Sequence, residues 1–235
     1  MPDYSKRSDR LEILDRPDVP FGDILLNMKE LNTINRLLGG HRITCKGIER
    51  IISSSARPKD YKWRICEIGC GNGNNITAIH NWCQANHIRA EFVGIDISEA
   101  CIAAGQQSAA AAYTNFIASD YRTAQLDQPP DIIFSSLFCH HFSDQQLVEQ
   151  LVWLKQNARY GFFINDLHRH FLAFHSIRIL TAVFSNSYLV KHDAPVSVLR
   201  GFRRKEWLQL FRNAGIDNFS IKWQWAFRWL IVIVN

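Results

Sequence analysis

The sequence predicts an α/β fold: a doubly wound, mostly parallel sheet of seven strands, with an antiparallel C-terminal hairpin and a helical N-terminal cap. Three observations predict it. Short apolar strands alternate with helical segments between residues 63 and 165, which implies a parallel sheet covered on both faces. A glycine-rich turn joins the first strand of that series to its first helix. The last two strands, at 219–225 and 227–234, follow one another without a helix between them.

Residues 1–58 are expected to form the N-terminal cap. Residues 1 to about 20 hold three prolines and many charges, so we expect this stretch to be loosely ordered. From Asp23 apolar side chains recur every three or four residues, which predicts a helix that ends at Gly39-Gly40. A shorter helix fits 44–52, with Thr44 as its N-terminal cap, and 53–58 is a predicted linker.

Residues 59–235 are expected to form the main domain. After the strand at 63–68, further strands are predicted at 91–97, 114–118, 131–135 and 160–165. Helices are predicted at 74–86, 98–112 and 144–157, and a last one at 205–214 precedes the hairpin. Residues 166–204 are too long for a plain crossover, so we expect an insertion there, with a mostly apolar helix at 171–184.

Composition and charge place the chain among ordinary cytoplasmic globular proteins. It has 235 residues, 47% hydrophobic and 21% charged, with a net charge of +5. The densest basic run, 200–205, is too short for a nucleic-acid-binding stripe, so no nucleic acid partner is expected. No apolar run reaches the length of a membrane-spanning helix, and the charged N-terminus predicts no secretory signal. The six cysteines lack Cys-x-x-Cys spacing and are expected to be reduced, with no structural zinc.

The glycine-rich turn reads Glu67-Ile-Gly69-Cys70-Gly71-Asn-Gly73-Asn74. Such a turn lets the backbone approach a ligand closely and aims the N-terminus of the next helix at it. Dinucleotides and S-adenosylmethionine are both bound in this way. A dinucleotide site prefers a third glycine where this chain has Asn74, and the acid Glu67 precedes the first glycine.

The pattern Glu67-x-Gly69-x-Gly71-x-Gly73 resembles motif I of class I S-adenosylmethionine-dependent methyltransferases, which have a Rossmann-like fold. The resemblance implies that Glu67 reaches the positively charged amino-acid end of the cofactor. It also implies that Asp96 accepts the ribose hydroxyls, that Asp120 contacts the adenine amino group, and that Ile97 and Tyr121 flank the adenine. The full set of expected cofactor-binding residues is Glu67, Gly69, Cys70, Gly71, Gly73, Asn74, Asp96, Ile97, Ser119, Asp120, Tyr121, Ser136 and Leu137.

Two further resemblances concern the subgroup. The segment 131–142 is similar to motif IV of quinone-methylating and small-molecule-methylating members of the family. The segments Ile34–Gly40 and His192–Arg200 are similar to a bacterial subgroup of small-molecule methyltransferases, and this resemblance covers most of residues 24–235.

A hydroxyl acceptor needs a base close to neutral pKa, and histidine is the usual choice. Five of the nine histidines follow the fourth and fifth strands or lie in the insertion: His140, His141, His168, His170 and His192. The expected catalytic residues are His140, His141, His168 and Asp166. Adjacent side chains point differently, so we expect at most one of His140 and His141 to face the site. Each of these histidines can instead be a structural hydrogen-bonding group, and Asp166 can instead pair with Arg169.

We therefore predict an S-adenosylmethionine-dependent O-methyltransferase of secondary metabolism, monomeric or homodimeric, acting on a small, aromatic or polyketide-like acceptor. The apolar helix at 171–184 either roofs a lipophilic acceptor or packs against residues 24–38. No metal is expected, although Asp166, His168 and His170 have the chemistry of ligands. An RNA or protein methyltransferase would show a broad basic face. A binding module without catalysis would not be expected to keep Glu67, the glycines, Asp96 and Asp120 together.

Overall fold

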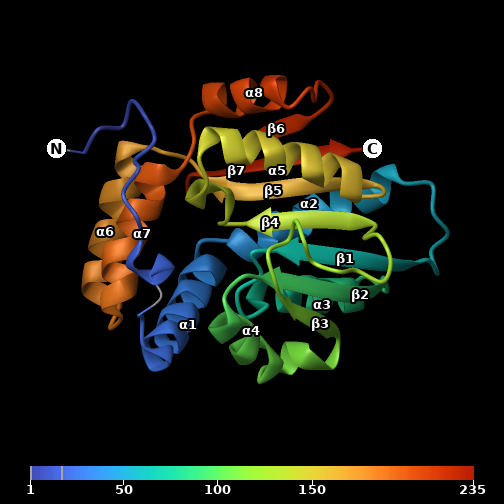
Figure 1. Ribbon diagram of the computed structural model, residues 1–235, viewed down its shortest axis with the longest axis horizontal. Coiled ribbons are helices and arrows are strands. Elements are labelled where there is room, and N and C mark those ends of the chain that lie inside the picture. The colour runs from blue at the N-terminus through green and yellow to red at the C-terminus, as the bar shows by residue number, and fades with distance from the viewer. Residues whose placement is uncertain (1, 17) are drawn as a thin grey trace.

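A seven-stranded sheet with the order β3-β2-β1-β4-β5-β7-β6 forms the centre of the computed structural model, which describes residues 2–16 and 18–235 (Figure 1). The strands are β1 Lys62–Ile68, β2 Arg89–Asp96, β3 Thr114–Ala118, β4 Ile132–Ser136, β5 Gly161–Leu167, β6 Ser220–Gln224 and β7 Arg228–Val234. Strands β1 to β5 pair in parallel, and β7 is antiparallel to both of its neighbours. The predicted fold class and C-terminal hairpin are confirmed.

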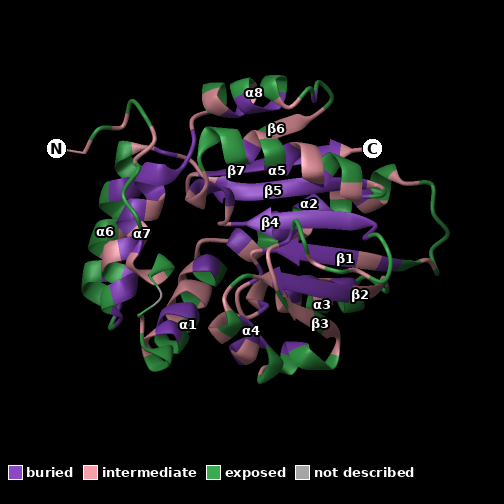
Figure 2. Ribbon diagram, viewed as in Figure 1, coloured by how far each residue is buried: buried purple, intermediate pink, exposed green. Residues whose placement is uncertain are grey.

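Helices cover both faces of the sheet. One face carries α5 (Asp144–Asn157) and α8 (Arg204–Asn213), and the other carries α2 (Gly40–Ser54), α3 (Asn74–Ala85) and α4 (Glu99–Gln106). Because side chains alternate along a strand, each strand contributes to both cores. Cys66 of β1, for example, packs towards α5, whereas Ile65 packs towards α2 and α3. Figure 2 shows the central strands almost entirely buried.

A third group of helices lies beyond the carboxyl ends of the parallel strands. These are α1 (Phe21–Leu37), α6 (Phe171–Phe184) and α7 (Tyr188–Arg200), towards which the arrowhead of β4 points in Figure 1. Helix α7 contacts both α6 and α1, so the three helices form one layer. None of the helices in the described ranges combines the length and the apolar character needed to cross a membrane.

Three helices differ from the prediction. The helix expected over 98–112 is divided into α4, which ends at Gln106, and the 3-10 helix η2 Ala109–Ala112. Helix α2 begins at Gly40, four residues before the expected start, and packs on β5 and β7 as part of the sheet's cover. Helix α7 lies in the insertion and was not predicted, since its Pro195 is unfavourable inside a helix. Buried side chains such as Leu189, Val190 and Leu199 hold α7 in place, so tertiary packing outweighs the local preference.

The N-terminal stretch is held far more firmly than its composition indicates. We call residues 2–16, which include the short 3-10 helix η1 Ile13–Asp15, the N-terminal strap. Arg7 donates to the carbonyl oxygens of Phe142 (2.7 Å) and Arg200 (3.0 Å). Asp193 of α7 accepts the backbone N–H groups of Ile13 (2.8 Å) and Leu14 (3.0 Å).

The expectation of loose order is therefore wrong for these residues, because their charges and N–H groups meet partners more than a hundred positions away. Met1 and Pro17, which the prediction also covered, lie outside the described residues.

Candidate active site

The glycine-rich turn connects β1 to α3 in a conformation that requires glycine. Gly69, Gly71 and Gly73 have φ angles of 67°, 54° and 80°. A Cβ atom at Gly69 would lie 2.1 Å from the ring of Phe138, so both backbone conformation and space exclude a side chain there. The N–H of Gly71 donates to Oδ2 of Asp96 (2.8 Å), which joins the turn to the end of β2.

Glu67 lies beside this turn with its side chain fully buried. Oε1 accepts from Nδ2 of Asn75 (3.1 Å), while Oε2 has no hydrogen-bond partner in the part of the chain that the structure describes. Burial raises the pKa of Glu67 well above its usual range, although the Asn75 bond opposes this. A buried carboxyl with a free oxygen is costly unless a ligand supplies a donor or a positive charge.

Asp96 ends β2 on the opposite side of the turn. Its Oδ1 accepts the N–H of Ser98 (2.9 Å), and its Oδ2 accepts that of Gly71. Burial nevertheless raises the pKa of Asp96, because these N–H groups only partly offset the loss of water. The structure thus places Glu67, the three glycines and Asp96 together, as the sequence predicted.

The residues expected around an adenine ring differ in their surroundings. Ile97 follows β2 and is 75% exposed, so its apolar side chain is free to contact a ligand. Tyr121 is buried against Phe138 and Trp153. Asp120 is paired with Arg122, whose guanidinium lowers the pKa of that carboxyl.

The remaining residues predicted to bind the cofactor lie in the glycine-rich turn or at the ends of β3 and β4. The N–H of Ser119 donates to the carbonyl of Asp96 (3.0 Å), which aligns the ends of β2 and β3. Cys70 packs its thiol into the core on the α2 face, and Asn74 begins α3. Ser136 Oγ accepts from Asn165 Nδ2 (3.3 Å). Leu137, at φ 55°, turns the chain after β4.

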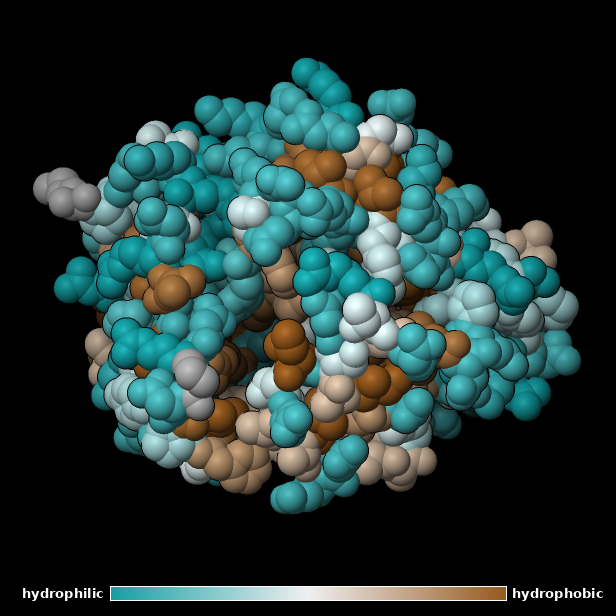
Figure 3. Space-filling view, viewed as in Figure 1, coloured by the Kyte–Doolittle hydropathy of each residue, from teal (hydrophilic) through white to brown (hydrophobic). Residues whose placement is uncertain are grey.

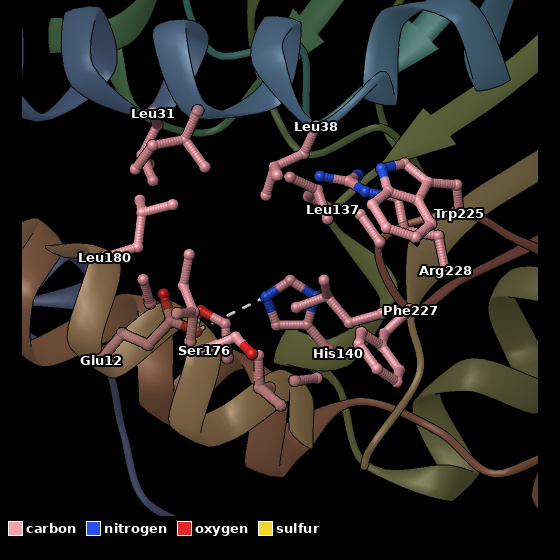
Figure 4. Close-up of a pocket in the computed structure, with 18 of the residues that line it drawn as sticks. Glu12, Leu31, Leu38, Leu137, His140, Ser176, Leu180, Trp225, Phe227 and Arg228 are labelled. Carbon is pink, nitrogen blue, oxygen red and sulfur yellow. Dashed lines mark hydrogen bonds and ion pairs between the residues drawn. The ribbon is translucent and has the colours of Figure 1, made fainter. Parts of the chain in front are cut away.

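A cavity of about 390 Å³ lies between α1, α6, α7 and the turn from β6 to β7. Its lining is mostly apolar. Leu31 points into it from α1, Leu38 from the residue that follows α1, and Leu180 from α6 (Figure 4). Figure 3 shows apolar side chains around a hollow near α1 on the same side of the molecule. One face of α6 therefore lines the cavity. This position is the one expected if residues 171–184 cover a lipophilic acceptor.

His140 forms the polar centre of this cavity. It lies in the 3-10 helix η3 (Cys139–His141) after β4, and its side chain is almost fully buried. Nδ1 is 2.8 Å from Oδ1 of Asp166 at the end of β5, and Nε2 is 3.5 Å from Oε1 of Glu12 in the N-terminal strap (Figure 4). Oε1 of Glu12 also accepts from Oγ of Ser197 (2.6 Å).

These two carboxylates control the charge of the imidazole. Burial disfavours protonation of His140, but Asp166 and Glu12 outweigh it and raise the pKa of His140 to about 9. Burial likewise acts to raise the pKa of Glu12, yet the bond from His140 and the nearby His141 lower it to about 2. The pKa of Asp166 is also lowered by His140 against the effect of burial.

His141 lines the same cavity, with Nδ1 3.2 Å from Oδ1 of Asp15. The expectation that at most one of this pair faces the site is wrong, because the tight η3 turn keeps the two rings only 4.4 Å apart. His168 is placed differently: its Nδ1 accepts from Nε1 of Trp223 (3.2 Å), and burial lowers the pKa of His168 to about 4. It is not among the residues that line the cavity.

The side chains of Glu12, His140 and His141 could together bind a metal ion, since their donor atoms lie within 4.8 Å of one another. In the present arrangement both nitrogens of His140 already face carboxylates. The other group considered from the sequence is dispersed, with Asp166 bonded to His140 and His168 bonded to Trp223.

Sequence reasoning missed two charged groups of the cavity, Glu12 and Arg228. Glu12 lies in a charge-rich stretch with no motif, and Arg228 starts an otherwise apolar strand. A charged residue at the start of an otherwise apolar strand was the available signal for Arg228.

A doubly wound sheet with a glycine-rich turn after β1, and a separate cavity beyond the strand ends, defines a Rossmann-like protein. Residues 59–215 match a family model described as a methyltransferase domain. The chain belongs to this family of class I S-adenosylmethionine-dependent methyltransferases, and S-adenosylmethionine is its cofactor. A comparison with curated protein sequences finds no match.

Solved structures with the same fold include three methyltransferases. The plantazolicin methyltransferase BpumL, in complex with a monoazolic desmethylPZN analog and SAH, is 15% identical with a TM-score of 0.65, and 89% of each chain is covered. Magnesium protoporphyrin IX methyltransferase from Synechocystis PCC 6803 is 16% identical, with a TM-score of 0.53 and 83% of each chain covered. Human N-acetylserotonin methyltransferase is 15% identical, with a TM-score of 0.62, covering 91% of this chain and 56% of that one.

Proposed function

We propose that this enzyme is an O-methyltransferase that acts on a small, lipophilic, aromatic or polyketide-like acceptor, with His140 as the general base. The observation that carries the proposal is the position of His140: its Nε2 faces an apolar cavity, and its Nδ1 is held by the buried carboxylate of Asp166. A base beside an apolar cavity suits an acceptor that must lose a proton, as a phenol or enol does.

The described residues fit S-adenosylmethionine. The free Oε2 of Glu67 suits the ammonium group of the cofactor, and the exposed Ile97 offers an apolar surface to the adenine. We propose that Asp96, which accepts the N–H of Gly71 in the glycine turn, also accepts the ribose hydroxyls. When bound, the cofactor supplies an electrophilic methyl group on a sulfonium.

The acceptor is proposed to bind in the cavity beside these strand ends. Leu137 lines the cavity from the turn after β4. The next residue, Phe138, packs against Gly69, so this turn connects the cavity to the glycine turn. Helices α1, α6 and α7 line the cavity mostly with apolar side chains, which favours binding of a lipophilic acceptor. We propose that the insertion 166–204 and the N-terminal strap together form the substrate lid.

The chain's own residues then handle one proton. Ionised Asp166 can only accept, so Nδ1 of His140 keeps its proton, and Nε2 is the atom that takes the acceptor's proton. Glu12 competes for the same position on Nε2. Entry of an acceptor hydroxyl between them would replace this contact, and the proton would afterwards pass to solvent.

The base is tested by comparing His140→Gln with His168→Gln, a matched change outside the cavity lining. Each variant is incubated with radiolabelled S-adenosylmethionine and a panel of phenolic and polyketide-like compounds. We expect His140→Gln to lose about 10²–10⁴-fold in kcat and His168→Gln to stay within a few-fold. SAH binding, measured by calorimetry, shows that each variant is folded. Equal activity of His140→Gln and wild type would overturn the assignment.

Cofactor binding is tested separately by Asp96→Ala. Loss of hydrogen bonds to a charged group should weaken S-adenosylmethionine binding by about 1.5–3 kcal/mol. Calorimetric titration with S-adenosylmethionine, and with a nicotinamide dinucleotide as the control, measures this. Unchanged affinity of the variant would remove Asp96 from the cofactor site.

A further inference from the structure

Arg228 is a buried cation at one end of the cavity. It is the first residue of β7, paired with Leu167 of β5, and its side chain is 3% exposed. Its guanidinium lies beside Leu137 and Trp225 in Figure 4. The neighbouring Gly40 leaves room for it, since a Cβ there would lie 3.2 Å from Cζ of Arg228.

The guanidinium lacks partners in its surroundings. Within the described ranges, Nε and Nη1 of Arg228 have no hydrogen-bond partner, and no ion pair involves this residue. Burial lowers the pKa of Arg228 to about 10, so the group is still charged at neutral pH. Burying a charge without hydrogen bonds is strongly unfavourable, so a buried arginine normally has an anionic partner.

Nearby acidic groups do not fill this role. Asp166 attracts Arg228 electrostatically, and its Oδ2 has no hydrogen-bond partner among the described residues, yet no hydrogen bond or ion pair joins the two groups. Its Oδ1 accepts from His140 (2.8 Å) and from the N–H of Leu167 (2.7 Å), so His140 already shares its negative charge. Glu12 is bonded to Ser197 and faces His140. The cavity lining near Arg228 includes Leu38, Leu137, Trp225 and Phe227. Outside the lining, Oδ1 of Asn35 lies beside the same Gly40 position and has no hydrogen-bond partner among the described residues, but this amide is neutral and does not balance the charge.

We propose that the methyl acceptor carries a carboxylate, or a comparably acidic oxygen, and that Arg228 binds it. This inference rests on the proposed function, because it takes the cavity as the acceptor site. The acceptor is then an amphiphilic ring compound, with its anionic group at Arg228, its hydroxyl at Nε2 of His140 and its apolar body among the leucines and aromatic rings. A guanidinium forms paired hydrogen bonds to a carboxylate, which fixes the acceptor's orientation.

The carboxylate of S-adenosylmethionine could bind a guanidinium in the same way. The experiment below therefore distinguishes an anion of the acceptor from the carboxylate of the cofactor. Arg228 lines the cavity, whereas Glu67, Gly69, Gly71 and Asp96 do not. This arrangement favours the acceptor as the source of the anion.

The test uses 1-hydroxy-2-naphthoate and 1-hydroxy-2-naphthamide, which share a ring and a hydroxyl but differ in charge. Binding of each to the wild-type SAH complex is measured by calorimetry, together with the affinity for SAH itself. We expect wild type to prefer the carboxylate by about tenfold or more, the effect of a charge-assisted hydrogen bond. Arg228→Met should abolish the preference with SAH affinity unchanged, and Arg228→Lys should keep part of it. Arg57→Met, which alters an arginine packed on Tyr61 and Tyr160, is the control and should match wild type.

Three outcomes would overturn the inference: equal binding of the two compounds by wild type, binding of neither compound, or a preference that survives in Arg228→Met. Weaker SAH binding by Arg228→Met, with the preference retained, would assign the anion to the cofactor. None of these measurements requires methyl transfer, so failure of His140 as a base would appear separately in the activity assay.

Discussion

His140 is positioned by two residues that lie far from it in the sequence. Asp166 holds one nitrogen from the end of β5, and Glu12 faces the other from the N-terminal strap. Because both partners are ionised, they stabilise the imidazolium over the neutral ring. An imidazole that is mostly protonated at neutral pH is a base only in its minor, deprotonated fraction.

Methyl transfer should therefore accelerate as the pH rises through about 9, the pKa of His140. Asp166→Asn removes one carboxylate, so it should lower this pKa and shift the inflection to lower pH. A pH–rate profile with saturating S-adenosylmethionine measures both. An inflection that does not move in Asp166→Asn would show that another group titrates.

Folding stability should follow the same group. The folded-state pKa of His140 lies above its ordinary value of 6.5, so its contribution is fully present below about pH 6.5 and is lost as the pH rises to about 9. The pKa of Glu12 is depressed from 4.5 to about 2, so its contribution is present above pH 4.5 and is lost below that. Thermal unfolding between pH 6 and 10 should show a decline that is smaller in His140→Gln; identical slopes would contradict this.

Removal of divalent cations should leave methyl transfer unchanged, because transfer from a sulfonium to a hydroxyl that His140 deprotonates needs no metal. Activity measured after dialysis against a chelator, with and without added Mg²⁺, Mn²⁺ or Zn²⁺, provides the check. A loss that one of these cations restores would instead assign Glu12, His140 and His141 to a metal site.

At the scale of elements, the N-terminal strap depends on α7. Asp193 accepts two backbone N–H groups of the strap, and Arg200 of the same helix donates to the carbonyl of Arg10 (2.6 Å). The sequence of the strap does not predict that Asp193 and Arg200 bind it. The strap has three acidic residues before residue 13 and no apolar periodicity that would indicate a packed element.

Asp193→Ala should free the strap, since each N–H that loses a charged acceptor costs about 1 kcal/mol or more. We expect faster amide exchange at Ile13 and Leu14, and a loss of about 1–3 kcal/mol in the free energy of unfolding. Asp217→Ala, at an exposed position, is the matched control. Unchanged exchange at Ile13 would show that other contacts hold the strap.

At the scale of the whole molecule, the sheet brings the glycine turn and the cavity to one edge. The glycine turn follows β1, Asp96 ends β2, and His140 and Asp166 follow β4 and β5. Carboxyl ends of parallel strands meet at the same edge, which is why residues far apart in sequence share one site. The helical layer of α1, α6 and α7 completes the cavity over this edge.

Cofactor binding should stabilise this whole assembly. A ligand at a hundred times its Kd adds about 2.7 kcal/mol, which for a chain of this size corresponds to roughly 5–11 °C in Tm. Thermal unfolding with and without SAH measures the shift, and a nicotinamide dinucleotide should produce none. A shift with the dinucleotide alone would be incompatible with the cofactor assigned to this family.

Local signals determined much of this protein without its structure. The strand and helix periods predicted the sheet, and the spacing of Glu67, the glycines and Asp96 predicted the cofactor site, because these residues act within one strand–turn–helix unit or at a neighbouring strand end. The histidines after β4 and β5 were also identified, since strand ends are where such sheets place their sites. The sequence did not show that His140 and His141 line the cavity whereas His168 does not.

Only the tertiary structure decided which of these groups meet. Glu12 and His140 are 128 positions apart, and Arg228 reaches the cavity only because β7 inserts beside β5. No local pattern encodes such contacts, since they depend on the packing of α1, α6 and α7 over the sheet edge. The cofactor was therefore evident from the sequence, whereas the shape and charge of the acceptor cavity came from long-range packing alone.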